Sequence, residues 1–546
     1  MQTPRSRPVL VAIGLCAIGC FTSDDGLDPL ASDKYSFYFP TAIVASPGLT
    51  SLYVVSSDFD LQFNGGTVKA LDLVELRKTL ETLRDALNAS AGAKSACSSV
   101  QLVHGDRTES LAAAEDKDRI IAPGPCKPLD RDFVNSLAIN AVSIGAFASG
   151  AVLAQNPVPP GAGSTGARLF MTVRGDPSVT YIDVPDDRSA PTVSICEVDP
   201  TCFSCNRDGN KRCNDDHKIG RDPAENLRHI TMPVEPVGIA ASDDGVAMVV
   251  ANQTTNQASL IVQPRPASAG IVPHPRLEFF ISDLPPGPTD VAAVPIPKFV
   301  SASPDLDYQP GFLMTFRGSA EVDLLRFNDD HQSNPPRPFI ARAFAEGITV
   351  NSSGVDSRGL AVDPSERQAC EAACSSDDLD CLAGCLGIPL RLFVANRAPT
   401  TLLVGEVRTE ITGEAGSKPT GALDTVTIFD SVPVAFGASK IGIGHIIDAN
   451  NVPRLRVFAV TFDSRLIFSY DPESRRVETV IHTGRGPHAI AFDTAADGSG
   501  KFHSLLYVAH FTDSYVGVVD LDQRNASTYG QMFASVGTPV APAEAK

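Results

Sequence analysis

The chain has 546 residues, 43% of them hydrophobic and 20% charged, which is the composition of a globular protein with a packed core. This balance excludes an intrinsically disordered chain, and glycine does not recur at every third position, which excludes collagen. The 45 basic and 64 acidic residues give a formal net charge of −19, which would repel nucleic-acid phosphates, so we expect no nucleic-acid partner.

The N-terminus has the features of a signal peptide. Arg5 and Arg7 precede an apolar run at residues 9–19, and Cys20 follows it. The run is too short to cross a bilayer as a helix, whereas a basic flank, a short apolar run and small residues at its end are typical of an exported protein. The sequence therefore predicts a signal peptide over residues 1–19, and no later stretch reaches the about 18 consecutive apolar residues of a membrane span.

The end of the apolar run resembles a bacterial lipobox. Ala17-Ile-Gly-Cys20 carries the cysteine of that motif, with alanine where leucine is most common. The resemblance implies cleavage before a lipid-carrying Cys20; a plain signal peptide with an incidental cysteine is the alternative. Phe21 stands where an aspartate commonly retains such lipoproteins in the inner membrane, so the resemblance implies an outer-membrane lipoprotein, facing either the periplasm or the surface. Residues 20–35 would form its lipid-bearing, flexible tether.

From residue 36 onward, a pattern of short apolar strands recurs seven times. Each copy holds a first strand, a second strand that ends near a polar residue, a third strand after a short turn, and a fourth strand that leads into the next copy. Four strands in each of seven copies predict an all-β fold, a seven-bladed β-propeller over residues 36–538 with a C-terminal tail at 539–546. The copies begin at Ala42, Ala141, Gly238, Val291, Gly359, Ile443 and Ala489.

The same count assigns individual strands and the closure of the ring. Fourth strands are expected at residues 228–233 and 477–482. Residues 35–39 and 529–533 are strand-like and have no place in the seven copies. Since closing a ring removes exposed strand edges, we expect these two terminal segments to share a blade.

The last copy resembles a blade of the YVTN family of seven-bladed propellers. Residues 486–492 (GPHAIAF), 506–510 (LYVAH) and 516–521 (VGVVDL) correspond to its strands, and the second strand of this family commonly reads L-Y-V-x-N. Asn252 and Asn396 hold the last position of that motif. The resemblance covers the chain from about residue 36 and implies a lactonase-like propeller with a polar central mouth. The other five copies depart from the motif, with Ser56, Val173, Phe316, Thr461 and His510 at this position.

The long insertions are expected on one face of the propeller. If strands alternate in direction, the connections between first and second strands and between third and fourth strands emerge on the same face. Insertions at residues 74–139, 185–227 and 364–389 all belong to these connections, so we call this the elaborated face and its opposite the trimmed face. The elaborated face is a candidate partner surface, although insertions that merely avoid a constrained face are an equal alternative. An amphipathic helix is expected from the spacing of Leu73, Leu76, Leu80, Leu83 and Leu87.

Ten cysteines remain beyond Cys16 and Cys20, and an even number in an exported protein favours disulfides. The last four are spaced so that two short helices folded back on each other would pair Cys370 with Cys385 and Cys374 with Cys381, which resembles the twin C-x3-C helical hairpin. The middle four, with His217 nearby, could hold zinc, but their irregular spacing and the oxidising compartment favour disulfides, so we expect no metal or other cofactor. The other six are Cys97, Cys126, Cys196, Cys202, Cys205 and Cys213.

Five residues near the trimmed-face mouth are candidate ligand-binding residues. Arg174, Arg317 and Arg397 directly follow second strands, and three guanidinium groups on one rim would suit a carboxylate or phosphate ligand. The alternative is that each arginine pairs with a loop acid. His488 begins a first strand and His510 ends a second strand near the same mouth, although a lone histidine is most often a hydrogen-bonding residue.

Three classes of function follow from these patterns. We expect a lipid-anchored binding or interaction scaffold, whose partners would be the membrane and an envelope protein or a small anionic ligand. A lactonase-like hydrolase or other enzyme with its site at the channel mouth is the alternative, and the chain lacks G-x-S-x-G, H-E-x-x-H and P-loop motifs. A redox or metal propeller would need several channel histidines, and only His488, His510 and His445 are near.

Overall fold

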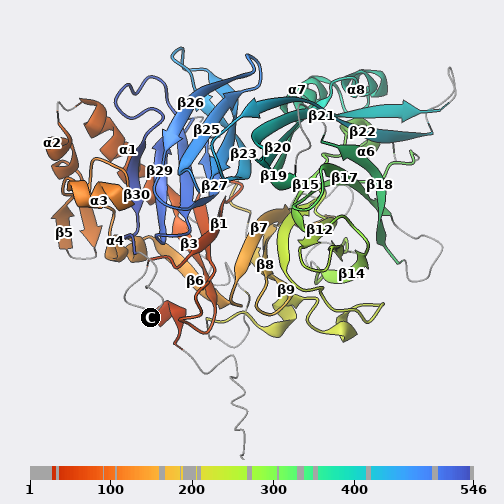
Figure 1. Ribbon diagram of the computed structural model, residues 1–546, viewed down its shortest axis with the longest axis horizontal. Coiled ribbons are helices and arrows are strands. Elements are labelled where there is room, and N and C mark those ends of the chain that lie inside the picture. Colours follow the sequence, from red (N-terminus) through yellow and green to blue (C-terminus); the bar gives the residue numbers. More distant parts are fainter. Residues whose placement is uncertain are drawn as a thin grey trace, which may run out of the picture.

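The computed structural model describes residues 27–31, 36–89, 92–104, 107–158, 166–184, 186–188, 205, 211–266, 273–303, 306–328, 337–348, 355–413, 420–494 and 502–540. Seven four-stranded antiparallel sheets form seven blades, so the predicted all-β seven-bladed propeller is confirmed (Figure 1). Cys20 with the signal peptide, Cys196 and Cys202 lie outside the described residues.

Each blade is built from strands that follow one another along the chain, from the inner edge of the ring outward. The first four blades are β1 (Pro40–Ala45), β2 (Ser51–Ser56), β3 (Gly66–Asp72) and β6 (Ala138–Ile144); β7 (Ala148–Gln155), β8 (Ala167–Val173), β9 (Ser178–Val184) and β10 (Lys218–Ile219); β11 (Pro236–Ala241), β12 (Ala247–Asn252), β13 (Gln257–Val262) and β14 (Arg276–Ile281); β15 (Pro288–Ala293), β16 (Gly311–Phe316), β17 (Glu321–Asn328) and β18 (Phe339–Gly347). The last three are β19 (Val355–Asp363), β20 (Leu390–Ala398), β21 (Thr400–Thr412) and β22 (Gly421–Pro433); β23 (Ala438–Ile447), β24 (Pro453–Thr461), β25 (Leu466–Asp471) and β26 (Arg476–His482); β27 (Pro487–Asp493), β28 (Leu505–His510), β29 (Tyr515–Asp520) and β30 (Met532–Val536).

The core lies between neighbouring blades. Every residue of β2, β12, β16 and β28 is buried, because the second strand of a blade is covered on both faces by the sheets beside it. This explains why second strands are almost uninterrupted runs of apolar residues. Seven hydrophobic clusters each join two adjacent blades, for example Tyr53 and Val55 of the first blade with Leu169 and Met171 of the second.

Two predicted strands are wrong. Residues 141–144 belong to β6, the outermost strand of the first blade, and not to the first strand of the second blade, which is β7. The long insertion before β6 makes that strand read as the start of a new repeat. Residues 228–233 form no strand; the fourth strand of the second blade is the two-residue β10, which lies earlier in the chain. The strand expected at 477–482 is present as β26.

The predicted closure of the ring is also wrong. The seventh blade takes all four strands from consecutive residues, and β30 is its own outer strand. The ring closes because the inner strand β1 packs beside β27. The described residues 36–39 form no strand with the C-terminal segment: the amide of Phe39 donates to Ser514 Oγ, and its carbonyl accepts from the amide of Ser57.

The insertion between β3 and β6 packs its amphipathic helix against the first and seventh blades. Helix α1 (Leu73–Ala89) buries Leu76, Leu80 and Leu83 in the cluster that joins these blades, so the predicted helix is confirmed. The segment is held by a Cys97–Cys126 disulfide. Its remaining elements are α2 (Ala93–Ser98), β4 (Gln101–His104), β5 (Arg107–Ser110), α3 (Asp116–Ile121) and α4 (Arg131–Ser136).

The other cysteine pairs brace the remaining insertions. Helices α7 (Ser365–Ala373) and α8 (Leu379–Cys385) carry the nested Cys370–Cys385 and Cys374–Cys381 disulfides, which confirms the predicted pairing. A Cys205–Cys213 disulfide closes part of the insertion after β9, so these two residues are not zinc ligands. The other short helices are α6 (Lys298–Ser301), η1 (Pro29–Ala31), η2 (Asp215–His217) and η3 (Pro223–Glu225).

The two ends of the described chain lie away from the helical hairpin. In Figure 1, α7 and α8 are at the upper edge, whereas the red N-terminal segment of the described chain is at the lower edge. Strands β21 and β22 are the longest of the molecule's described strands and extend outward beside the hairpin. Among the residues that the structure describes, no helix is long and apolar enough to cross a membrane.

Candidate functional site

The polar residue at the end of the second strand fixes loops on the trimmed face. Asn252 Nδ2 donates to the carbonyl of Pro233 at 2.8 Å, and Asn396 Nδ2 donates to that of Pro399 at 2.7 Å. Thr461 makes the same kind of bond with its hydroxyl, to the carbonyl of Leu466 at 2.8 Å. These side chains are buried and directed at backbone groups, so the position that carries the family resemblance has a structural role.

His510 occupies this position in the seventh blade and plays the same part. Its Nε2 accepts from the amide of Gly484 at 3.2 Å, and its Nδ1 lies 3.0 Å from the carbonyl of Val508, which defines a neutral imidazole with its proton on Nδ1. The ring is fully buried and stacks on Tyr515, with ring centroids 4.2 Å apart. Burial lowers the pKa of His510 to about 3. It therefore offers no charge to a ligand.

His488 is half-buried beside the channel and is also neutral. Its Nδ1 lies 2.9 Å from the carbonyl of Thr41, to which it donates. Burial and the charge of Lys440 lower its pKa to about 4. Its ring packs against Phe511 and Phe462, with centroids 5.8 and 6.4 Å away, so it forms part of an aromatic cluster at the mouth.

The three arginines are each paired with a carboxylate from another blade or from the connection into it. Arg174 bonds to Glu235, and Arg397 bonds to Asp463. Arg317 Nε lies 3.5 Å from Asp356 Oδ1, and its side chain is about half exposed. The alternative of pairing with a loop acid therefore holds for Arg174 and Arg397, whereas the partner of Arg317 belongs to β19.

One of these arginines, Arg317, lines a pocket, whereas Arg174 only pairs with Glu235 of its lining and Arg397 lies elsewhere. A cavity of about 480 Å³ on the trimmed face is lined by Arg317, Glu235 and Asp356, among others. Hydrogen bonds from Thr254 and Arg174, with the added charge of Arg317, hold the pKa of Glu235 below its usual value. Arg397 instead packs over the ring of Phe436, 5.8 Å from its centroid.

The central channel contains an ion pair that the sequence patterns did not reveal. Lys440 Nζ lies 3.0 Å from Asp290 Oδ1, which joins the inner strands of the sixth and fourth blades. The amide of Leu360 donates to the other oxygen of Asp290 at 3.2 Å. The cavity beside Lys440 has a volume of only about 160 Å³ and is lined mainly by small and apolar residues. The sequence signal for this ion pair was a lysine, Lys440, within an inner strand of the propeller.

No metal site is built by the described residues, since no group of three or more His, Cys, Asp or Glu side chains there is placed to hold an ion. His445, the third histidine considered for a metal centre, lies beside Phe502 with centroids 6.2 Å apart. Burial lowers its pKa as well.

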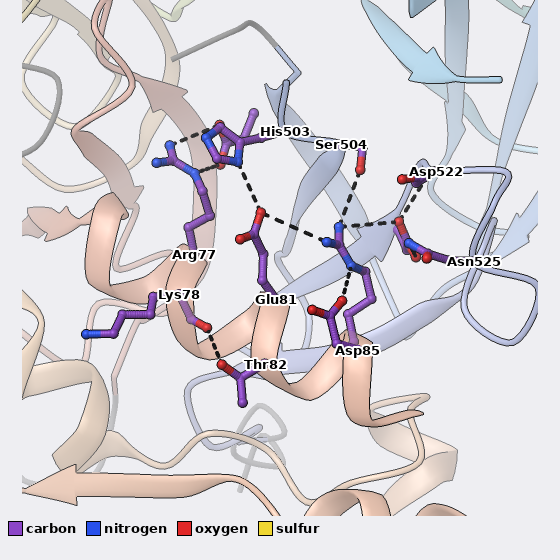
Figure 2. Close-up of polar contacts among 12 residues, drawn as sticks. Arg77, Lys78, Glu81, Thr82, Asp85, His503, Ser504, Asp522 and Asn525 are labelled. Atoms are coloured by element: carbon purple, nitrogen blue, oxygen red, sulfur yellow. Dashed lines mark hydrogen bonds and ion pairs between the residues drawn. The ribbon is translucent and has the colours of Figure 1, made fainter. Parts of the chain in front are cut away.

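On the elaborated face, α1 is locked to the seventh blade by a row of polar contacts along one side of the helix (Figure 2). Arg77 and Asp493 form a buried ion pair at 2.7 Å, and His503 Nδ1 lies 3.1 Å from Glu81 Oε1. One turn further on, Arg84 contacts Ser504. Breaking a buried pair such as that of Arg77 costs about 3–5 kcal/mol, so the helix is fixed in position.

The insertion after β9 is tied to the first blade in a similar way. Asp187 accepts hydrogen bonds from the hydroxyls of Ser46 and Thr50, the latter at 2.7 Å, and from the amide of Gly48 at 2.6 Å. All of these groups belong to the turn between β1 and β2 or its immediate flanks. Adjacent insertions are thus connected to neighbouring blades on the same face.

The hairpin α7–α8 and the arm formed by β21 and β22 share a buried polar network. Asp424 of the arm lies 2.9 Å from Arg326 Nη1, and Arg367 of α7 donates to Thr409 of the arm at 2.9 Å. Helix α8 is capped at its N-terminus by Asp378, whose side chain accepts from the amide of Cys381 at 3.0 Å. The network fixes the hairpin against the arm.

Exposed apolar side chains stand on this braced region. Leu379 at the start of α8 is 42% exposed, and Leu423 on the arm is 59% exposed. Ile411 lies on the neighbouring strand of the arm and is also exposed. Side chains held in place before binding lose little conformational entropy when a partner binds.

No model of a known protein family and no curated protein sequence matches the chain. Among solved structures it is similar to a hydrazine synthase of Kuenenia stuttgartiensis, with 12% identity over 91% of this chain and 99% of that chain and a TM-score of 0.42. It is also similar to proteins assigned as 6-phosphogluconolactonases from Bacteroides uniformis (10% identity, 80% of this chain, 83% of that chain, TM-score 0.36) and Bacteroides fragilis (11%, 82%, 86%, 0.38). These likenesses concern the fold alone.

We expect the buried neutral His510 to make the fold sensitive to acid. Its pKa of about 3 in the fold lies below the ordinary value of about 6.5, so the unfolded chain takes up a proton first as the pH falls. Stability is then fully present above about pH 6.5 and decreases below it, by about 2 kcal/mol between pH 7 and pH 5. His510→Asn, which imitates Asn252 and Asn396, should lower the melting temperature at pH 7 yet show a smaller fall between pH 7 and pH 5.

Thermal melts of the wild type and the variant at both pH values measure this difference. The exposed His482 supplies a control, because His482→Asn should keep the pH dependence of the wild type. A His510→Asn variant with the full wild-type pH dependence would contradict the assignment.

Proposed function

We propose that this protein is a lipid-anchored propeller of the cell envelope that binds another protein through its elaborated face. The observation that carries the proposal is the set of exposed apolar side chains, Leu379, Ile411 and Leu423, on insertions braced by disulfides and a buried polar network. A surface fixed in advance loses little conformational entropy on binding, which favours association.

The anchor is supported by the sequence at the N-terminus. The basic flank, the apolar run and Cys20 have the order that export and lipidation require. Four disulfides among the described residues agree with folding in an oxidising compartment. We place the protein at the outer membrane because Phe21 follows the cysteine.

Replacing the anchor residue should release the protein. Cys20→Ser should abolish incorporation of labelled palmitate and move the protein from the membrane fraction to the soluble fraction, while Cys16→Ser should change neither. Labelling that survives Cys20→Ser would contradict the anchor.

A photo-crosslinking amino acid at Leu379 or Leu423 should capture the partner in intact cells. The expected result is a discrete adduct from each position, because both side chains are exposed on the braced region. Val480, on the outer strand of the sixth blade, is 39% exposed and serves as the matched control, from which this adduct should be missing. Equal capture from Val480 would contradict a binding site on the elaborated face.

A second candidate function is the binding or turnover of a small anionic ligand at the trimmed face. It is favoured by the pocket of about 480 Å³ beside Arg317, whose guanidinium is about half exposed and 3.5 Å from its nearest carboxylate oxygen partner. A guanidinium group suits a carboxylate or phosphate ligand.

Calorimetry with a panel of phosphates and carboxylates tests this second candidate. Arg317→Gln should weaken binding at least tenfold, whereas Arg397→Gln should leave it unchanged, and both variants should lose at most about 1 kcal/mol of stability because the ion pairs are partly exposed. If the wild type binds no member of the panel, the site does not exist.

A further inference from the structure

The described chain begins on the trimmed face. The carbonyl of Leu27 accepts a hydrogen bond from the amide of Asn64 at 3.1 Å, and η1 packs against β3 and β6. Asn64 belongs to the loop at residues 57–65, which joins β2 to β3 and therefore emerges on the trimmed face. The last described residue lies there too, since the amide of Val540 donates to the carbonyl of Asp513 in a turn of the same kind.

A lipid on Cys20 would lie close to this face. Only six residues separate Cys20 from Leu27, and even a fully extended chain covers at most about 3.6 Å per residue. The two residues can therefore be no more than about 25 Å apart, which is less than the width of a typical domain. An anchor on so short a connection holds the trimmed face toward the bilayer.

The same face carries exposed apolar side chains next to the chain's entry point. Phe59 is 48% exposed and Leu61 is 59% exposed, both in the loop that binds Leu27, and Phe436 is 64% exposed between β22 and β23. Leu61 has a φ of 56°, in the left-handed region that is unfavourable for leucine.

A cluster of aromatic rings supports these exposed side chains from below. Phe59 contacts Phe511 and Phe147, with centroids 5.2 and 5.7 Å apart. Phe511 in turn contacts Phe462 at 6.4 Å. Next to Phe462, the hydroxyl of Ser464 donates to the carbonyl of Phe436. The cluster links the loop of the first blade to the turns of the seventh and sixth blades.

One of the two acids of this loop, Asp58, is partly neutralised by the fold. Burial, with the nearby charge of Asp60, raises the pKa of Asp58 to about 7. Asp60 accepts a hydrogen bond from the hydroxyl of Tyr38 at 2.5 Å. Arg465 is exposed on the turn of the sixth blade. The surface around the apolar side chains is thus less repelled by a bilayer than the net charge of −19 would indicate.

We propose that the trimmed face lies on the membrane that carries the anchor, with Phe59, Leu61 and Phe436 in contact with the lipid. This proposal rests on the lipid anchor proposed above. In this proposal the trimmed face contacts lipid and the elaborated face contacts another protein. Exposed aromatic and aliphatic side chains on a rigid support are suited to the interfacial region of a bilayer.

The chain contains no tryptophan, so a single substitution gives an unambiguous fluorescence signal. The full-length lipidated protein carrying Leu61→Trp is reconstituted into vesicles of phosphatidylethanolamine and phosphatidylglycerol, with or without brominated phosphatidylcholine. Leu423→Trp on the elaborated face is the matched control, because both leucines are 59% exposed. We expect a shift of the Leu61→Trp emission to shorter wavelength and at least twofold quenching by the brominated lipid, with neither effect for Leu423→Trp.

Flotation of the vesicles separates the two proposals. If the protein floats with the vesicles and Leu61→Trp is not quenched more than Leu423→Trp, the docking is wrong while the anchor stands. A shifted but unquenched emission would show that a protein surface, and not lipid, covers this face, which also overturns the docking. If the protein does not float, the anchor and the docking fail together. Phe436→Trp provides a second position on the same face and should behave as Leu61→Trp does.

Discussion

The packing of one twisted sheet against the next is the interaction on which the whole molecule depends. A single blade buries little surface by itself. Its second strand is buried only because the neighbouring blades cover both faces of the sheet. The hydrophobic clusters accordingly belong to pairs of blades, including the pair formed by the first and the seventh. The ring therefore closes by inner-strand and inter-blade contact, without a blade shared between the two ends of the chain.

This packing explains the polar residues that sit close to the core. Second strands run directly into trimmed-face turns, where backbone groups would otherwise be buried without partners. Asn252 and Asn396 satisfy such groups by donating to a backbone carbonyl, and His510 does so by accepting from a backbone amide. The arginines that follow second strands then pair across blade boundaries. Charged and polar groups near the mouth are thus largely occupied in holding blades together.

Much of the fold could be predicted from the sequence, because short continuous apolar runs such as residues 506–510 indicate a strand that is covered on both faces. The nested disulfides followed from cysteine spacing on two short helices. The errors arose where a local pattern fits two assignments or is too short to detect. Strand β6 resembles the first strand of a repeat because a long insertion precedes it. Strand β10 has only two residues, too few to form a recognisable strand pattern. Contacts such as that of Lys440 with Asp290 join blades that are distant in sequence, and no rule based on residue spacing predicts them. The same holds for the candidate site, since the partners of Arg174 and Arg397 come from other blades or from connections into them.

The asymmetry of the two faces has a physical basis in the same architecture. Connections between third and fourth strands lie at the outer part of a blade, where an insertion such as α1 can spread over neighbouring sheets and bury its leucines without disturbing the ring. Connections from a fourth strand to the next first strand must cross a blade from its outer to its inner edge, and several of them are short and tightly packed. Here the aromatic rings of Phe39, Phe147 and Phe511 fill the mouth. A propeller with an anchor at this end has its trimmed face close to the bilayer and its braced insertions far from it. Under the proposed anchor, the distant face is the one that would leave room for both the helical hairpin and a protein partner.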